Sequence, residues 1–206
     1  MIERPAAVLF DADGVVQTSL PITGEVARVL GLDEQSAEAF LQEMWGRLDA
    51  LGCLVGGGDL LADVADLLAA RGHAPEAAAF YAGILNATTV PHEDVLALVD
   101  RLRSTGVYCG LATNQDSVRL RYMLDELGYA PRFDAVFASC DLGLRKPTRE
   151  YFDAVVHRLA VAPPSVLFLD DHPDNVAAAR QVGMRAEQIN TPADVGVALR
   201  AHGVLG

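Results

Sequence analysis

The sequence predicts an α/β fold, in which helices on both faces cover a parallel sheet and a small all-helical cap is inserted after the first strand. Short runs of β-forming residues alternate along the chain with stretches of helical spacing, as in parallel α/β proteins. The first four runs are apolar throughout, which is typical of strands buried on both faces. The 206 residues, about half of them apolar, suffice for one sizeable core of this Rossmann-like kind.

The predicted elements follow one another in regular order. The runs expected to form strands are residues 6–10, 107–112, 135–139, 166–169 and 184–189. The stretches expected to form helices around them are residues 92–104, 117–127, 148–160 and 173–182. This alternation brings the carboxyl ends of the strands to one edge of the sheet, where ligands bind in open parallel sheets.

The segment between the first two strands is far longer than a crossover needs. Nearly a hundred residues separate Phe10 from Val107, whereas a crossover helix takes about a dozen. One helix is predicted by apolar residues at helical spacing, namely Phe40, Leu41, Met44, Trp45, Leu48 and Leu51. Further helices are expected at 59–71 and 75–86, and no run in the segment predicts a strand.

We therefore expect two domains. Residues 1–16 and 89–206 would form the α/β core, and residues 17–88 would form a helical cap joined to it by hinges near 15–21 and 88–91. Met44 and Trp45 are interpreted as part of the cap's own core, although either could instead line its mouth above the site.

Charge and cysteine content narrow the class of protein. The formal net charge of −12 argues against nucleic acid or an anionic membrane as a partner, so an anionic substrate would need a locally positive site. The three cysteines are widely spaced, and no stretch is long and apolar enough for a membrane span or a signal peptide. We expect reduced thiols in a cytoplasmic protein. The oligomeric state is left open.

Polar side chains follow four of the predicted strands, near the edge where ligands bind. They are Asp11 and Asp13, then Thr113 and Asn114, then Lys146, and finally Asp170 and Asp171. Two carboxylates about 4 Å apart repel by roughly 4 kcal/mol at an effective dielectric near 20, so aspartates gathered there need a cation. Any one of them could instead cap a helix, but the all-oxygen set favours Mg²⁺ with a shared phosphate. Lys146, the only lysine in the chain, would add a compact ammonium.

Four motifs, "FDADGVV", "LATN", "RKP" and "FLDD", occur in this order along the chain. Together they resemble the four motifs of the haloacid-dehalogenase-like (HAD) hydrolase superfamily. The helical insert resembles the cap of its capped phosphatase and beta-phosphoglucomutase-like branch. The resemblance extends from the first strand to residue 183 and implies phosphoryl transfer at the edge of the sheet.

The resemblance implies a role for each acidic residue. Asp11 would be the nucleophile that forms an aspartyl-phosphate, and Asp13 would be the general acid and then the base that activates water. Asp11, the main-chain carbonyl of Asp13 and Asp171 would hold Mg²⁺, with Asp170 beside them as a further ligand or an orienting group. Phosphoryl transfer depends above all on positioning and charge neutralisation, which these residue types can supply.

The resemblance also implies which residues bind the phosphoryl group. Thr113 and the amide of Asn114 would hold its oxygens, and Lys146 would lie between Asp11 and the phosphate. After the acid pair, His172 is interpreted as a solvated loop residue and Asn175 as a residue that stabilises the loop and the start of the next helix.

The sequence therefore predicts a Mg²⁺-dependent phosphatase whose partner is a small phosphorylated substrate, such as a sugar phosphate, phosphoglycolate or a nucleotide-like ester. A phosphomutase would use the same residues, and that alternative stays open. A haloacid dehalogenase fits less well, because attack on carbon needs neither Mg²⁺ nor Asp13. A non-catalytic phosphate-binding module is disfavoured by the intact motifs. In a signalling receiver domain the acidic pair comes early along the chain, whereas here it comes last.

Overall fold

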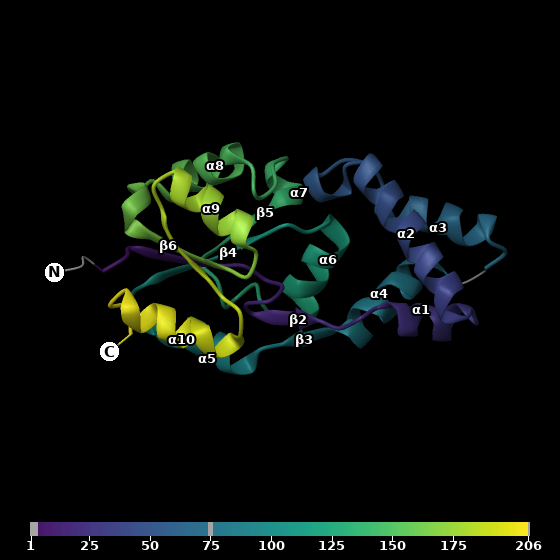
Figure 1. Ribbon diagram of the computed structural model, residues 1–206, viewed down its shortest axis with the longest axis horizontal. Coiled ribbons are helices and arrows are strands. Elements are labelled where there is room, and N and C mark those ends of the chain that lie inside the picture. The colour runs from purple at the N-terminus through teal and green to yellow at the C-terminus, as the bar shows by residue number, and fades with distance from the viewer. Residues whose placement is uncertain (1–3, 74–75, 206) are drawn as a thin grey trace.

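The computed structural model describes residues 4–73 and 76–205, and its centre is a parallel sheet with the order β5-β4-β1-β6-β7 (Figure 1). Its strands are β1 (Ala7–Phe10), β4 (Tyr108–Thr113), β5 (Ala135–Ala138), β6 (Val166–Asp170) and β7 (Arg185–Gln188). Each pair of neighbours is parallel, and Leu9 of β1 lies in register with Gly110 of β4 and Phe168 of β6. The predicted α/β fold class and its five strands are confirmed, with every boundary within one residue.

Helices cover both faces of this sheet. The helices and shorter turns of the core are α5 (Glu93–Ser104), α6 (Ser117–Arg121), a π-helical turn (Tyr122–Glu126), α7 (Ser139–Leu142), α8 (Arg149–Leu159), a 3₁₀ turn (Pro163–Ser165), α9 (Pro173–Gln181) and α10 (Pro192–Ala201). In Figure 1, α5 and α10 lie below the sheet, and α8 and α9 lie above it. The sheet is therefore the middle layer of three.

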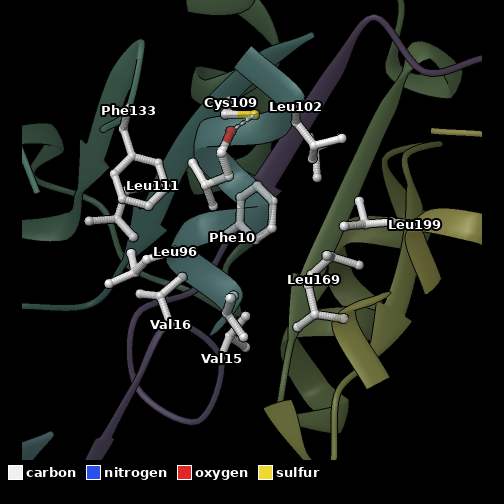
Figure 2. Close-up of a cluster of buried hydrophobic side chains, with 14 of the residues drawn as sticks. Phe10, Val15, Val16, Leu96, Leu102, Cys109, Leu111, Phe133, Leu169 and Leu199 are labelled. Carbon is white, nitrogen blue, oxygen red and sulfur yellow. Dashed lines mark hydrogen bonds between the residues drawn. The ribbon is translucent and has the colours of Figure 1, made fainter. Parts of the chain in front are cut away.

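Alternation along β1 distributes its side chains between the two faces. Val8 and Phe10 pack into one buried cluster with residues of α5 and α10, such as Leu96 and Leu199. Figure 2 shows Phe10 in this cluster, between Leu96 and Leu111 on one side and Leu169 and Leu199 on the other. Leu9 packs on the opposite face, in a second cluster built with α8 and α9. Burial on both faces explains why the central strands are apolar throughout.

The inserted segment packs around a third cluster of its own, which includes Phe40, Met44 and Ile84. Its elements are α1 (Thr23–Leu30), α2 (Glu34–Ala50), a 3₁₀ turn (Cys53–Val55), α3 (Leu60–Ala70) and α4 (Ala77–Thr88). The first residue of the helix expected at 75–86 lies outside the described residues. In Figure 1 these helices form a separate group to the right of the sheet, beyond its β5, α6 and α7 side.

Two short strands join the insert to the core. Strand β2 (Gln17–Ser19) pairs antiparallel with β3 (Thr89–Pro91), so the outgoing and returning connections lie side by side. The expectation of no strand within 17–88 is therefore wrong for β2. A strand of three residues is too short for a periodic pattern, and its partner lies some seventy residues away in the sequence.

The helices α1, α7 and α10 were also not expected from the sequence. Helix α1 has an apolar face in which Val26 and Leu30 are buried, so the spacing of these residues was a usable signal, although the helix has only eight residues. Cys53, Cys109 and Cys140 carry free thiols, and the first two are buried. Among residues 4–73 and 76–205, no helix combines the length and apolar character needed to cross a membrane.

Candidate active site

Lys146 lies at the centre of the candidate site, at the carboxyl ends of β1, β4 and β6. Its Nζ is 2.8 Å from Oδ1 of Asp11 and 2.7 Å from Oδ2 of Asp170. It also donates a hydrogen bond of 2.9 Å to the main-chain carbonyl of Ala112 in β4. Only 3% of Lys146 is exposed, so the ammonium is held by three oxygens in a site from which water is largely excluded. The structure thus joins residues from three neighbouring strands through one side chain.

Burial and the neighbouring charges have opposite effects on the pKa values of Lys146 and Asp11. Burial by itself would lower the pKa of Lys146, but Asp11 and Asp170 outweigh it and raise that pKa, so the ammonium stays charged. Burial raises the pKa of Asp11 to about 7, with Asp170 adding to the rise and Lys146 opposing it. A cation placed beside Asp11 would favour its ionised form.

Asn114 holds the backbone of Lys146. Its Nδ2 donates to the carbonyl of Lys146, and its Oδ1 accepts from the N–H of Lys146, each over 2.9 Å. The side-chain amide expected to face phosphate is thus occupied in positioning the lysine. Thr113 beside it is buried, and its hydroxyl accepts a hydrogen bond of 3.3 Å from Nε2 of Gln115.

Asp170 is fully buried and saturated with hydrogen bonds. Its Oδ1 accepts from the main-chain N–H of His172 at 2.8 Å and from Nδ2 of Asn175 at 2.9 Å. Its Oδ2 accepts from Lys146 and, at 3.1 Å, from the same Nδ2 of Asn175. Asn175 therefore fixes the carboxylate from the first turn of α9, while His172 is largely exposed.

Three carboxylates at this edge are arranged as a cation site would require. Oxygen atoms of Asp11, Asp170 and Asp171 all lie within 4.8 Å of one another. Burial and the neighbouring Asp170 raise the pKa of Asp171. A Cβ atom on Gly14 would lie 2.4 Å from Oδ2 of Asp171, so only glycine leaves room for that carboxylate. This close oxygen-only set suits a hard divalent cation such as Mg²⁺.

Asp13 points to a different set of partners. Its Oδ1 accepts hydrogen bonds from Gln17 at 3.0 Å, Ser19 at 2.8 Å and Arg119 at 2.7 Å. Its Oδ2 accepts from Nε2 of Gln115 at 2.8 Å. Burial opposes ionisation, but Arg119 and the three hydrogen-bonding side chains outweigh it and lower the pKa of Asp13. The carboxylate is thus oriented in its charged form.

Sequence reasoning did not identify Gln115, Arg119 or Ser19. Gln115 directly follows Asn114 at the end of β4 and is 97% buried, which is unusual for a glutamine in a loop. Arg119 lies on α6 and donates both to Asp13 and to the Ser19 hydroxyl of β2. The position of Gln115 after a strand was a usable signal. The pairing of Arg119 with residues about a hundred positions away was not.

Met44 and Trp45 differ in their surroundings. Met44 is fully buried in the cluster of the insert, as interpreted from the sequence. Trp45 is 44% exposed and lines a cavity that also touches Ser19 and Arg119, so its interpretation as a core residue is wrong. Helical spacing places Trp45 beside the apolar stripe but does not show which edge of the stripe stays open.

A family model described as haloacid dehalogenase-like hydrolase matches residues 5–183. The chain belongs to this family. The HAD-like chain is 31% identical over 188 residues to a phosphoglycolate phosphatase of Rhodospirillum rubrum, an alignment that covers 87% of the chain and 77% of the relative. With such phosphatase relatives inside a hydrolase family, the protein is a phosphatase.

Solved structures share the fold of this HAD-like phosphatase. A HAD-like hydrolase from Porphyromonas gingivalis aligns with a TM-score of 0.76 at 22% identity, covering 98% of both chains. A HAD family enzyme from Bacteroides thetaiotaomicron, crystallised with magnesium and inorganic phosphate, aligns with a TM-score of 0.72 at 19% identity. That alignment covers 88% of this chain and 92% of the neighbour.

Proposed function

We propose that the protein hydrolyses a small phosphate monoester in a Mg²⁺-dependent reaction, through a phosphoryl group carried on Asp11. The observation that carries the proposal is the position of the Lys146 ammonium, which lies between Asp11 and Asp170 beside a cluster of three carboxylates. A phosphate dianion is the ligand that such a pairing of ammonium and metal-binding acids would neutralise.

The acidic cluster fits Mg²⁺. Asp11, Asp171 and the main-chain carbonyl of Asp13 would hold the ion. Asp170 would orient Lys146, because each of its oxygens already accepts two hydrogen bonds. Bound Mg²⁺ would offset the repulsion among the carboxylates and stabilise charge on the phosphoryl oxygens. The magnesium and phosphate in the crystals of the Bacteroides neighbour support this assignment.

In the first step, Asp11 would attack phosphorus and form an acyl-phosphate bond as the ester P–O bond breaks. Both hydrogen bonds that described residues make to Asp11 end on Oδ1, from Ala12 and Lys146, which leaves Oδ2 for the attack. The Thr113 hydroxyl and the main-chain N–H of Asn114 would hold the phosphoryl oxygens. Asp13, in its protonated form, would transfer its proton to the departing alcohol oxygen.

In the second step, water would attack phosphorus and the bond to Asp11 would break, releasing inorganic phosphate. Asp13 would now accept a proton from the water, and its four donors already favour the carboxylate form. The same donors oppose the protonated form of the first step. Substrate must therefore displace some of them before the first step.

We also propose that residues 17–88 act as a cap over a core of residues 1–16 and 89–206. The support is the separate buried cluster of the insert and its attachment through the paired strands β2 and β3. Movement about this pair would open the site for exchange and close it for chemistry, because excluding water strengthens the interactions with phosphate.

The nucleophile is tested by Asp11→Asn. Wild-type protein with Mg²⁺ should release phosphate from p-nitrophenyl phosphate, and Asp11→Asn should lower kcat by at least about 10³-fold. The matched control is Asp174→Asn, which removes an acid that is exposed on the same edge of the sheet. Turnover by Asp11→Asn near the wild-type rate would dismiss the aspartyl-phosphate.

The metal is tested separately with a chelator. EDTA should abolish turnover, and added Mg²⁺ should restore it. Full activity in EDTA would refute the metal assignment, but it would not affect the assignment of Asp11 as the nucleophile. With a sugar phosphate as substrate, an isomeric sugar phosphate in place of inorganic phosphate would identify a mutase.

A further inference from the structure

A cavity of about 110 Å³ is lined by residues of the insert and, on the side of the core, by Arg119 of α6. We call it the leaving-group cavity, and its lining residues are Ser19, Leu20, Ile22, Trp45, Tyr81, Ile84, Leu85, Thr88 and Arg119. Ser19 and Arg119 both donate to Oδ1 of Asp13, so two lining residues of the cavity contact the proposed general acid directly. The alcohol part of a phosphate ester held by Asp11 and Lys146 would extend into it.

The walls of the leaving-group cavity are apolar. Leu20 and Ile22 come from the connection after β2, Trp45 comes from α2, and Ile84 and Leu85 come from α4. Leu20 is 46% exposed, so an apolar group in the cavity would cover surface that now faces water. Each apolar atom covered in this way favours binding through the hydrophobic effect.

The hydroxyl groups around the leaving-group cavity are already used within the protein. Ser19 donates to Asp13 at 2.8 Å, Tyr81 donates to Asp116 at 2.9 Å, and Thr88 donates to the carbonyl of Ile84 at 2.8 Å. Their protons are therefore committed, so each of these hydroxyls could only accept a hydrogen bond from a ligand, and a ligand oxygen that needs a donor here would stay unpaired at a cost of about 1–3 kcal/mol. The cavity therefore offers a polyhydroxylated leaving group no free hydroxyl proton.

The cation in the lining, Arg119, is partly occupied. Arg119 forms an ion pair of 2.7 Å with Asp13, and its Nε, which is buried without an acceptor among the described residues, belongs to the same anchored guanidinium. A carboxylate placed there would lie beside the charge of Asp13 and compete with it for Arg119. Besides the Arg119 Nε, the Trp45 indole N–H is a lining side-chain donor that makes no hydrogen bond within the described chain.

We infer that the substrate is the phosphate monoester of an apolar alcohol, such as an alkyl, isoprenoid or aryl group, rather than a phosphorylated sugar or hydroxy acid. This inference rests on the proposed phosphatase function and names its substrate class. A cavity of roughly 150 Å³ takes benzene, so about 110 Å³ accommodates the first four or five carbon atoms. A second cavity of about 220 Å³ is also lined by Trp45. Its other lining residues are Leu48, Asp49, Cys53, Leu54 and Asp116.

The test is a series of alkyl phosphates measured by phosphate release with Mg²⁺. From methyl to pentyl phosphate, kcat/KM should rise about four-fold per methylene, on the order of 10² in total. 2-Phosphoglycolate and glucose 6-phosphate should fall below propyl phosphate. A flat series, or phosphoglycolate ahead of pentyl phosphate, would overturn the inference. No turnover of any ester, p-nitrophenyl phosphate included, would instead overturn the proposed function.

Trp45→Ala examines the cavity itself. Trp45 lines both cavities, so removing the indole should enlarge the space around the alcohol. The advantage of pentyl over methyl phosphate should then shrink several-fold, while octyl phosphate gains relative to pentyl. The control is Val29→Ala, an exposed apolar residue of α1 outside both cavities, which should leave the series unchanged. An equal loss for all chain lengths in Trp45→Ala would show that the indole does not touch the alcohol and would count against the inference.

Discussion

At the phosphate end of the site, formed by Asp11, Asp13, Lys146 and Asp170, each charged side chain is held by two or more hydrogen bonds or ion pairs. In the leaving-group cavity beside it, most of the lining is hydrocarbon and the few hydroxyls are turned to other partners. The two regions meet at Arg119 and Ser19, which contact Asp13 and also line the cavity.

This difference follows from what each region must do. Phosphoryl transfer requires charges fixed where charge develops, so each charged group needs partners that hold its position. An apolar group is held by contact area alone, which several different side chains could supply. The phosphate end therefore requires one arrangement of its charged groups. Substitutions in the insert, by contrast, could change which alcohol group the cavity binds.

The largest effect is expected at Lys146. Lys146→Met removes the cation between two buried carboxylates, and leaving buried charge uncompensated costs about 3–5 kcal/mol of unfolding free energy. We expect a loss of kcat of at least about 10³-fold for every phosphate ester, with a lower midpoint in urea. Lys146→Arg should lose nearly as much activity, because a planar guanidinium cannot place one nitrogen among three oxygens.

The neighbouring residue provides the control for this prediction. Arg145 also pairs with an acid, Asp49 of α2, but both side chains are about half exposed or more. Arg145→Met should therefore cost no more than about 1 kcal/mol and leave kcat unchanged. If Lys146→Arg kept wild-type kcat, the argument for a compact ammonium would be wrong.

The sequence predicted the sheet well because its strands are buried on both faces. An unbroken apolar run marks such a strand whatever its partners are, as in β1 and β6. The pair β2 and β3 carries no comparable pattern, since three residues bounded by a proline have no recognisable period. The paired connection was therefore not predictable.

The site divides in the same way. The sequence could predict that Asp11, Lys146 and Asp170 meet. Each lies at or beyond the end of a different strand, and parallel strands end at one edge of the sheet. Arg119 meets Asp13 only through the folding of α6 against β2, which no local spacing encodes. Trp45 has the spacing of a core residue and yet faces a cavity. The meeting of the three residues at the sheet edge was thus predictable, and the cavity lined by Trp45 and Arg119 was not.

A smaller effect is expected from Gly14→Ala, which acts on the metal site alone. The added Cβ would lie 2.4 Å from Oδ2 of Asp171 and displace that carboxylate. We expect the Mg²⁺ concentration for half-maximal activity to rise by about 10–100-fold, measured by metal titration at saturating substrate. The preference for longer alkyl phosphates should not change, because the cavity is untouched.

Gly31→Ala is the matched control for backbone strain. Gly31 has a φ of +66°, close to the +78° of Gly14, but a Cβ there meets nothing within 4 Å. Both variants should lose about 1–2 kcal/mol of unfolding free energy, which is the cost of a side chain in the left-handed region. Only Gly14→Ala should require more Mg²⁺. A similar metal requirement in both would mean that Asp171 is not a ligand.

The smallest of the three effects is expected from Arg119→Gln, at the point where the two regions meet. Asp13 would keep Gln17, Ser19 and Gln115 as donors but lose its only cation, so kcat should fall about ten-fold. The pair is partly exposed, and its loss should cost no more than about 1 kcal/mol of unfolding free energy. Arg121→Gln, an exposed arginine of the same helix, should change neither quantity.

The alkyl phosphate series shows which region Arg119 serves. If it acts only by holding Asp13, the ten-fold loss should be equal for methyl and pentyl phosphate, because both need the same proton transfer. A loss that grows with chain length would place its side-chain methylenes against the alcohol, as part of the cavity wall. Wild-type kcat in Arg119→Gln would show that the remaining three donors orient Asp13 without it, and the phosphate end would then be independent of the cavity.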